Sequence, residues 1–163
     1  MTIARIGLAI GLALGLSACS SKFETYNGPE VTQLQVYKSE RVLYLLHDNE
    51  VLKAYHVSLG GDPVGPKEVE GDEKTPEGLY YINRRNPESA FYLSLGISYP
   101  NPHDVEVARA MGQSPGGDIF IHGQRGRRTN ITDWTAGCIA IPNRDMRDVY
   151  AMVKDGTPIF IMP

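Results

Sequence analysis

Short segments rich in Val, Leu, Ile and Tyr, separated by turns, make up most of this chain of 163 residues. This pattern is typical of strands, and we expect them at Leu34–Tyr37, Val42–Leu46, Val51–Leu59, Leu79–Asn83, Tyr92–Ser98, Ile119–Ile121, Ile139–Ile141 and Pro158–Met162. Asp104–Met111 and Asn143–Val153 have helical spacing instead, the second with Asn143 as its cap. The sequence therefore predicts one mainly antiparallel β-sandwich or barrel with one or two helices.

Residues 60–78 lack any periodicity and are rich in Gly, Pro and acidic residues. A loop of this length in a compact domain is usually functional or mobile. Its polar residues Asp72, Lys74 and Thr75 shape the rim of a site or form a solvated turn.

The charge balance excludes a general nucleic-acid binder as the leading interpretation. Lys and Arg number 16 against 19 Asp and Glu, and the formal net charge is -3. Such a chain produces no field that would gather nucleic acid or anionic lipid.

The N-terminus has the features of an export signal. Ile6–Leu16 is an apolar run preceded by Arg5, too short for a membrane span and typical of a signal-peptide core. Leu16-Ser17-Ala18-Cys19 resembles a bacterial lipobox. We expect residues 1–18 to be a lipoprotein signal peptide, Cys19 to carry lipid at the start of a tether over residues 19–30, and residues 31–163 to form the domain. An ordinary signal peptide with a chance Cys is the alternative.

These features predict a periplasmic lipoprotein of the cell envelope. Ser20 follows the Cys where Asp would resemble an inner-membrane retention signal, so we expect an outer-membrane anchor. If Cys19 carries lipid, Cys138 is the only remaining thiol.

Two of the apolar strands are flanked by reactive residues. His122-Gly123 follows Ile121, and Thr135-Ala136-Gly137 leads directly into Cys138. An imidazole beside a thiol raises the thiolate fraction and can then act as a general acid. Gly137 would let backbone N–H groups face a developing oxyanion. By pattern alone, a buried Cys and a core His explain these residues equally well.

The ordered motifs resemble the L,D-transpeptidase catalytic domain, also called the YkuD domain, in its bacterial lipoprotein subgroup. IFIHG and TAGCIAI resemble the family's His-Gly and Ser/Thr-x-Gly-Cys signature. Upstream, Gly71-Asp72, the segment from Lys74 to Gly78, and Tyr80 resemble its GD-x-x-TP-x-G-x-Y loop and strand. The resemblance extends over about Leu34 to Pro163.

The resemblance implies a YkuD-like β-sandwich or partly closed barrel with mixed sheets, and acyl transfer on peptidoglycan stem peptides. Cys138 would be the nucleophile that forms a thioester, and His122 the base. The Gly123 carbonyl would orient the imidazole. No metal or cofactor is implied, and a peptidoglycan-attached lipoprotein is a further partner.

The chain also departs from the family pattern. Ala136 replaces a frequent His, and Ala140 replaces a frequent Arg beside the nucleophile. The second change removes the usual cation for a substrate carboxylate. The linker contributes other candidates for substrate binding, which are Arg125, Arg127, Arg128, Trp134 and Thr135. Tyr99 is a further candidate, although Trp134 and Tyr99 are equally compatible with packing roles and the arginines with a solvated loop.

Three alternatives remain open. A hydrolase of the same fold would trim a terminal D-alanine or release a bound lipoprotein. A noncatalytic wall-binding lipoprotein would keep the fold without needing Cys138 and His122 together. A zinc peptidase would use Cys138, His122 and His103 as ligands.

Overall fold

The structure is a computed structural model that describes residues 22–124 and 132–163. It contains eight strands and two helices, in the order β1 (Gln33–Tyr37), β2 (Val42–His47), β3 (Glu50–His56), β4 (Gly78–Asn86), β5 (Ser94–Ile97), α1 (Pro102–Ala110), β6 (Phe120–His122), β7 (Ile139–Ala140), α2 (Asn143–Met152) and β8 (Pro158–Met162). Every strand and helix expected from the sequence is present. The ends of β8 are those expected, and each other element differs at one or both ends.

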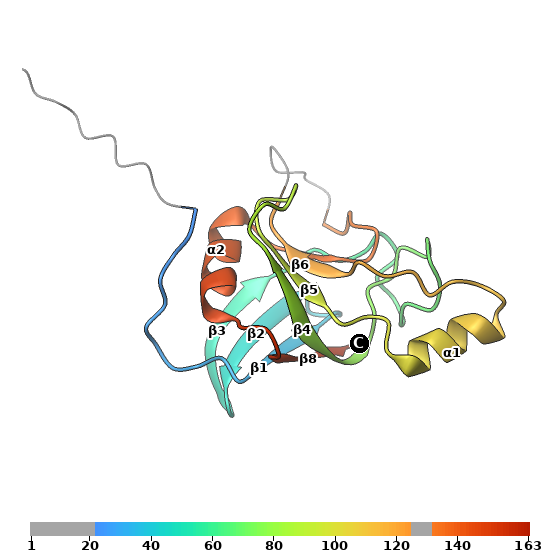
Figure 1. Ribbon diagram of the computed structural model, residues 1–163, viewed down its shortest axis with the longest axis horizontal. Helices are drawn as coiled ribbons and strands as arrows, with labels where there is room; N and C mark the ends of the chain where they lie inside the picture. The colour runs from blue at the N-terminus through green and yellow to red at the C-terminus, as the bar shows by residue number, and fades with distance from the viewer. Residues whose placement is uncertain (1–21, 125–131) are drawn as a thin grey trace, which may run out of the picture.

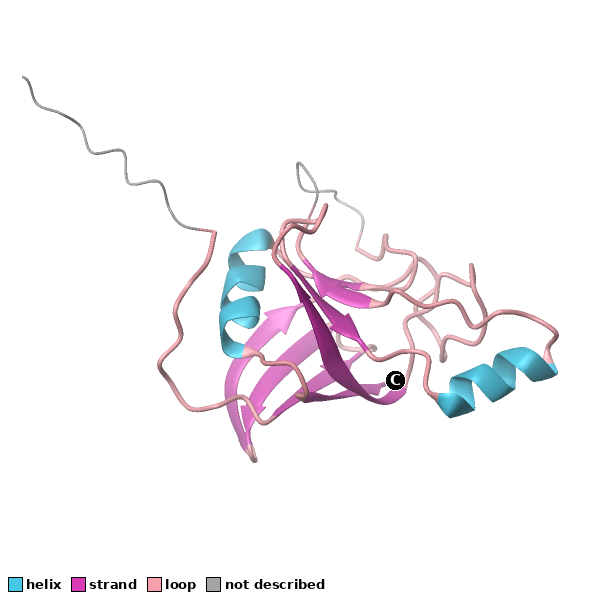
Figure 2. Ribbon diagram, viewed as in Figure 1, coloured by secondary structure: helices cyan, strands magenta, loops and turns pink. Residues whose placement is uncertain are grey.

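The strands form one mixed, curled sheet in the order β3-β2-β1-β8-β4-β5-β6-β7. The pairs β1/β8 and β6/β7 are parallel, and the other pairs are antiparallel. Figure 1 shows the sheet curving into a partly closed barrel, and Figure 2 shows how strands predominate over helices. The predicted mainly β fold with mixed pairing and two short helices is confirmed.

Alternating burial explains why the central strands form. In β1 and β8 every second side chain is buried, so one face of each strand packs into the core. Leu34, Val36, Ile159 and Ile161 are the buried residues of these two strands. The register pairs Leu34 with Ile159 and Val36 with Ile161, which places the four side chains in one layer.

Helix α2 covers part of this core with Met146, Val149, Tyr150 and Met152. The expected Asn cap is wrong, because Pro142 occupies the N-cap position and makes no side-chain cap hydrogen bond. The Asn143 amide oxygen instead accepts a hydrogen bond of 2.6 Å from the Gln124 N–H, two residues after His122. The side chain therefore connects the end of β6 to the helix rather than capping it.

Helix α1 lies beyond the end of the sheet (Figure 1) and begins in a capping box. The Asn101 side chain accepts from the Asp104 N–H, and the Asp104 carboxylate accepts from the Asn101 N–H. The Tyr80 hydroxyl donates to the same carboxylate, at 3.0 Å from Oδ2. Because Tyr80 belongs to β4, this bond joins α1 to the sheet. In the described parts of the chain, no helix has the length and apolar character needed to cross a membrane.

The long loop of residues 60–78 is held by buried polar side chains. The Asp72 carboxylate accepts hydrogen bonds from the Glu68, Val69 and Lys74 N–H groups and from Lys67 Nζ at 2.8 Å. Lys38, which is 2% exposed, donates to the Thr75 carbonyl at 3.0 Å and to Glu77 at 2.7 Å. Asp72 is therefore an internal organiser of this loop rather than a solvated charge.

The segment of residues 22–30 runs past α2 (Figure 1) and is fixed to the domain by side-chain contacts. Lys22 donates to the Pro87 carbonyl at 2.6 Å, and Glu24 pairs with Arg147 of α2 at 3.2 Å. Phe23 lies 6.4 Å from the Tyr150 ring. The described part of the predicted tether thus packs on the domain.

Candidate active site

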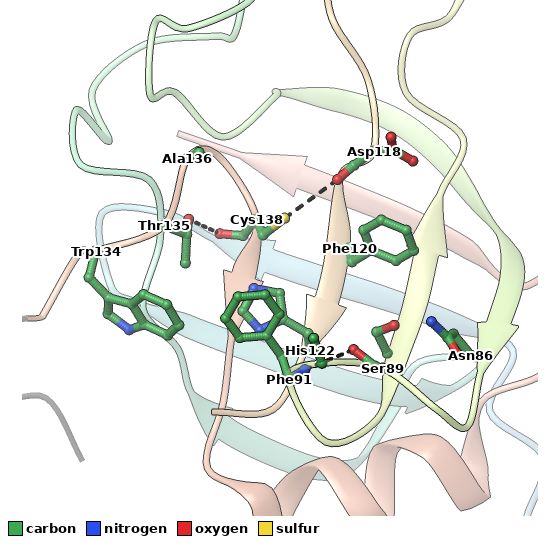
Figure 3. Close-up of a pocket in the computed structure, with 12 residues that line it drawn as sticks. Asn86, Ser89, Phe91, Asp118, Phe120, His122, Trp134, Thr135, Ala136 and Cys138 are labelled. Atoms are coloured by element: carbon green, nitrogen blue, oxygen red, sulfur yellow. Dashed lines mark hydrogen bonds between the residues drawn. The ribbon is translucent and has the colours of Figure 1, made fainter. Parts of the chain in front are cut away.

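The pairing of β6 with β7 brings His122 and Cys138 to the same face of the sheet. The two strands are parallel, with Ile121 opposite Ile139 and His122 opposite Ala140. Side chains alternate along a strand, so Ile121 and Ile139, both 0% exposed, point into the core. His122 and Cys138 take the other face, and Figure 3 shows both side chains at one cavity.

This cavity has a volume of about 440 Å³ and a largely apolar wall. Its described lining comes from the turn after β4, from β5, β6 and their flanks, and from the segment before β7. The lining residues are Asn86, Ser89, Ala90, Phe91, Ser94, Asp118, Phe120, His122, Trp134, Thr135, Ala136 and Cys138. The size suits a small peptide segment.

The orientation of His122 is fixed by the backbone and by two aromatic rings. Its Nδ1 lies 2.6 Å from the Gly123 carbonyl oxygen, which can only accept, so Nδ1 carries the proton and Nε2 is left as the basic nitrogen. The Phe91 and Trp134 rings lie 4.6 and 5.8 Å from the imidazole. Burial lowers the pKa of His122 below its usual value, and the bond to Gly123 opposes this effect. The imidazole is therefore neutral at pH 7.

Cys138 is half-buried, and its thiol lies 3.6 Å from the Asp118 carbonyl oxygen. Burial raises the pKa of the thiol above its usual value, the backbone N–H of Phe120 opposes this effect, and the Asp118 carboxylate raises the pKa further. We expected a nearby imidazole to enlarge the thiolate fraction, whereas desolvation dominates in the unliganded cavity. The resting pair is thus a neutral thiol and a neutral imidazole.

Thr135 and Gly137 shape the turn that presents the thiol. The Thr135 hydroxyl donates to the Cys138 carbonyl at 2.7 Å and accepts from the Gly137 N–H at 3.1 Å. Gly137 has a φ of +126°, and a Cβ there would lie 2.6 Å from the Lys74 carbonyl oxygen, so only glycine fits. In this structure the Gly137 N–H donates to the Thr135 hydroxyl. Its role toward a developing oxyanion therefore stays a prediction.

Asp133 holds the start of the same segment. Its carboxylate accepts from the Leu59 N–H at 2.9 Å and pairs with Arg41 at 2.9 Å. Backbone bonds between Ser58 and Ala140, both 2.8 Å, then flank β7 on its second side. Ser58 and Leu59, just before the long loop, therefore hold the segment that carries Cys138 by direct hydrogen bonds.

The other residues predicted for substrate binding have different fates. Trp134 and Thr135 line the cavity. The Trp134 Nε1–H is buried and has no hydrogen-bond partner within the described part of the chain. Tyr99 does not line the cavity. It is 5% exposed, packs on Tyr80 and donates its hydroxyl to the Pro115 carbonyl, so it has the packing role that we considered as its alternative.

Four predicted residues cannot be placed. Arg125, Arg127 and Arg128 lie outside the described residues, and so does Cys19. The zinc alternative gains nothing from the structure, since the described Cys, His, Asp and Glu residues form no group of three that could hold a metal ion.

Sequence reasoning missed much of the cavity wall. Phe91 and Phe120 line it, as does Asp118, which lies two residues before the strand that ends at His122. The proximity of Asp118 to a candidate base was a usable signal. Phe91 lies in a turn with no such signal, and only the folded chain brings it to the imidazole.

The fold and this cavity define a class: a curled β-sheet domain that presents a cysteine and a histidine together. The family model for the L,D-transpeptidase catalytic domain, YkuD, matches residues 32–161. The chain belongs to this family, which confirms the resemblance seen in its motifs.

Among curated proteins, the chain is similar to "Putative L,D-transpeptidase YafK" of Escherichia coli (strain K12). The two are 30% identical over 136 residues, which is 80% of this chain and 50% of that protein. The chain therefore spans about half the length of the curated relative it matches.

Solved structures show the same fold. The helical cell shape determining protein Pgp2 from Campylobacter jejuni aligns with a TM-score of 0.62 and 28% identity, covering 84% of this chain and 48% of that chain. The Ldtfm-avibactam carbamoyl enzyme aligns with a TM-score of 0.58 at 17% identity, covering 82% of this chain and 49% of that chain. At that identity the second likeness concerns the fold alone.

Proposed function

We propose that this protein is a cysteine-dependent L,D-transpeptidase that acts on peptidoglycan stem peptides through a thioester. The observation that carries the proposal is the placement of Cys138 and His122 on one face of β6 and β7, at a cavity of about 440 Å³. Membership of the YkuD family supports the reaction class and the substrate.

In the proposed reaction, His122 Nε2 takes the thiol proton as Cys138 Sγ attacks the carbonyl between meso-diaminopimelate and the terminal D-alanine. The tetrahedral intermediate collapses to a thioester, and the imidazolium gives its proton to the departing D-alanine amine. An incoming amine then attacks the thioester and restores the thiol. The Gly123 carbonyl, 2.6 Å from Nδ1, holds the ring throughout and takes the place of the acid in a triad.

The neutral resting pair makes this a substrate-triggered step. Because burial disfavours both the thiolate and the imidazolium, proton transfer becomes favourable only as the attack begins. An idle thiol that stays protonated also resists oxidation, which suits a lone cysteine in an oxidising compartment.

We further propose that the protein is a lipoprotein of the bacterial envelope. The support is the sequence alone: the apolar run Ile6–Leu16 and the lipobox ending at Cys19. Lipidation would place the domain beside its peptidoglycan substrate. Mass spectrometry of the membrane-bound chain tests this, because Cys19→Ser should remove the lipid mass and release the protein.

The proposed reaction is tested with the purified full chain and a defined disaccharide tetrapeptide. Mass spectrometry should show loss of D-alanine and, with an added amine acceptor such as a second stem or a free D-amino acid, a new amide. Cys138→Ala is the matched control. Tripeptide formed at the same rate with and without acceptor would indicate the hydrolase instead, and no product under either condition would favour the noncatalytic wall-binding lipoprotein.

A further inference from the structure

Asp118 is a lone acidic residue in the described wall of the cavity that holds the thiol. Among the described residues that line the cavity there is no Lys or Arg, and Asp118 is the only acidic one. The Asp118 carbonyl is the group that contacts Cys138 Sγ, at 3.6 Å. Its side chain is 84% exposed, and Figure 3 shows it at the rim, with the carbonyl toward Cys138 and the carboxylate directed away from the thiol. It can therefore meet a part of the substrate that lies away from the reacting bond.

Asp118 also belongs to a second hollow next to the first. This hollow has a volume of about 260 Å³ and is lined by Asn83, Arg84, Ile97, Tyr99, Asp118 and Ile119. Arg84 Nη2 lies 2.9 Å from Asp118 Oδ1. The two hollows therefore share Asp118, and its partner Arg84 lines the second one.

Three features hold Arg84 in this position. The register of β4 and β5 shifts between Ile82 and Arg84, and such bulges redirect side chains next to active sites. The guanidinium lies 4.7 Å above the Phe120 ring. Gly96, which pairs with both Arg84 and Phe120, makes the stack possible, because a Cβ there would lie 3.1 Å from the Arg84 Cβ and 3.4 Å from the Phe120 ring.

The contribution of the Arg84–Asp118 pair to stability does not explain why Arg84 is held by three separate features. Arg84 and Asp118 have side chains that are 56% and 84% exposed, and such surface pairs contribute about 0–1 kcal/mol. A bulge, a glycine and an aromatic platform are devices that preorganise a guanidinium for a planar anion. The arrangement is that of a recognition site left open to solvent.

We propose that Asp118 and Arg84 form a subsite for a zwitterionic amino-acid centre of the acyl donor, in which Asp118 binds its ammonium group and Arg84 its carboxylate. The proposal rests on the proposed function and names the part of the substrate that is read. The side chain of meso-diaminopimelate ends in such a centre, joined to the reacting residue by a short methylene chain. The apolar wall around Phe120 accommodates that chain.

The subsite also gives the chain a cation in place of the missing arginine. Ala140 is opposite His122 and is 1% exposed, so no cation projects from that position. Arg84 of β4 stacks on Phe120, which lines the cavity, and itself lines the neighbouring hollow. A charge-assisted, bidentate contact from arginine provides geometric selection that a lysine would lack.

The test compares kcat/KM of the full chain for three tetrapeptide stems that differ only at the third residue. One carries meso-diaminopimelate, one carries lysine, which lacks the side-chain carboxylate, and one carries 2-aminopimelate, which lacks the side-chain ammonium. Arg84→Ala should lower the diaminopimelate-to-lysine ratio at least about tenfold, the scale of one charge-assisted contact. Asp118→Asn, which tolerates the positive φ of 55° and keeps the carbonyl, should lower the diaminopimelate-to-aminopimelate ratio similarly.

Matched exposed residues provide the controls. Arg109→Ala on α1 and Asp155→Asn after α2 make the same chemical changes away from the cavity and should leave both ratios as in the wild type. Wild-type ratios near one, or ratios that are unchanged in both test variants, would overturn the subsite and leave the proposed reaction unaffected.

If no stem reacts, the proposed function fails. Calorimetric binding of the three stems to Cys138→Ala then decides the subsite separately: preference for the diaminopimelate stem that Arg84→Ala removes supports it, and equal affinities overturn it.

Discussion

The strands β1–β3 and the strands β5–β7 belong to one sheet but are fixed in different ways. The first three have 5, 6 and 7 residues and pair along nearly their whole lengths, with one register shift between Leu45 and Leu46, so backbone ladders determine where they lie. The last three have 4, 3 and 2 residues. Their surroundings depend on single side chains such as Thr135, Asp133 and Asn143. Many backbone hydrogen bonds therefore hold the geometry of β1–β3, so the loss of one side chain should not displace these strands. The geometry of the site depends on a few side-chain hydrogen bonds.

The largest expected effect is a loss of turnover without a loss of stability. Cys138→Ala and His122→Ala should each reduce turnover of the tetrapeptide by more than about a thousandfold, because nucleophile and base act as one unit. Melting temperatures should stay close to that of the wild type for Cys138→Ala. A carbapenem should add its mass to the wild-type protein and not to Cys138→Ala. Normal turnover by Cys138→Ala would disprove the covalent mechanism.

The converse effect is a loss of stability in the scaffold without a loss of turnover by the folded protein. Leu45→Ala in β2 removes a side chain that is 0% exposed, and urea unfolding should show a loss of about 2–5 kcal/mol. The folded fraction should keep the wild-type kcat/KM. Val51→Ala in β3 is the matched control, since Val51 is 51% exposed and its truncation should have little effect on unfolding. A large fall in kcat for folded Leu45→Ala would show that the two regions are not separable in this way.

A pair of identical substitutions sharpens the comparison. Thr135→Val removes the hydroxyl that binds the Gly137 N–H and the Cys138 carbonyl, and kcat should fall about tenfold or more with a stability loss of about 1–2 kcal/mol. Thr32→Val in the scaffold removes a hydroxyl that accepts from the Asp48 N–H at 2.7 Å. It should show a similar loss of stability and an unchanged kcat. Equal kcat values for the two variants would mean that the Thr135 hydroxyl does not position the thiol.

The smallest expected effect is the dependence on pH. Burial lowers the pKa of His122 in the folded state, so the unfolded chain binds more protons between that pKa and about 6.5. Stability should therefore decline as pH falls from about 6.5 through the lowered pKa, and His122→Asn should remove this part of the decline. The acidic limb of kcat/KM should have its midpoint below about 6.5, since only a neutral imidazole accepts the thiol proton. A midpoint above that value would contradict the neutral resting pair.

The sequence was most informative where its periodicity and its motifs agreed. The Val, Leu, Ile and Tyr content of Leu34–Tyr37 and Pro158–Met162 predicted where these strands lie. The motifs located Cys138 and His122. Helix caps were less predictable: Asn143 has the right residue type for a cap, but the bond to Gln124 outweighs that local preference.

The cavity wall lay largely beyond sequence reasoning. Phe91 reaches the cavity from a turn, and Arg84 lines the neighbouring hollow beside a bulge. Neither position leaves a periodic signature in the sequence. The sequence left Asp72 open between the rim of a site and a solvated turn, because the burial of its partner Lys67 depends on how the whole loop folds back. Long-range packing decided these positions, and no single-sequence pattern encodes it.

The parallel pairing of β6 with β7 has a consequence for how the protein tolerates insertions. His122 and Cys138 are aligned by the register of Ile121 with Ile139 and of His122 with Ala140, and not by the number of residues that separate them. Added residues in the linker would leave that register unchanged. One residue added inside either strand would turn a reactive side chain to the opposite face. Length variation in this domain should therefore accumulate between the His-Gly and Gly-Cys motifs, while the strands that carry them keep a fixed length.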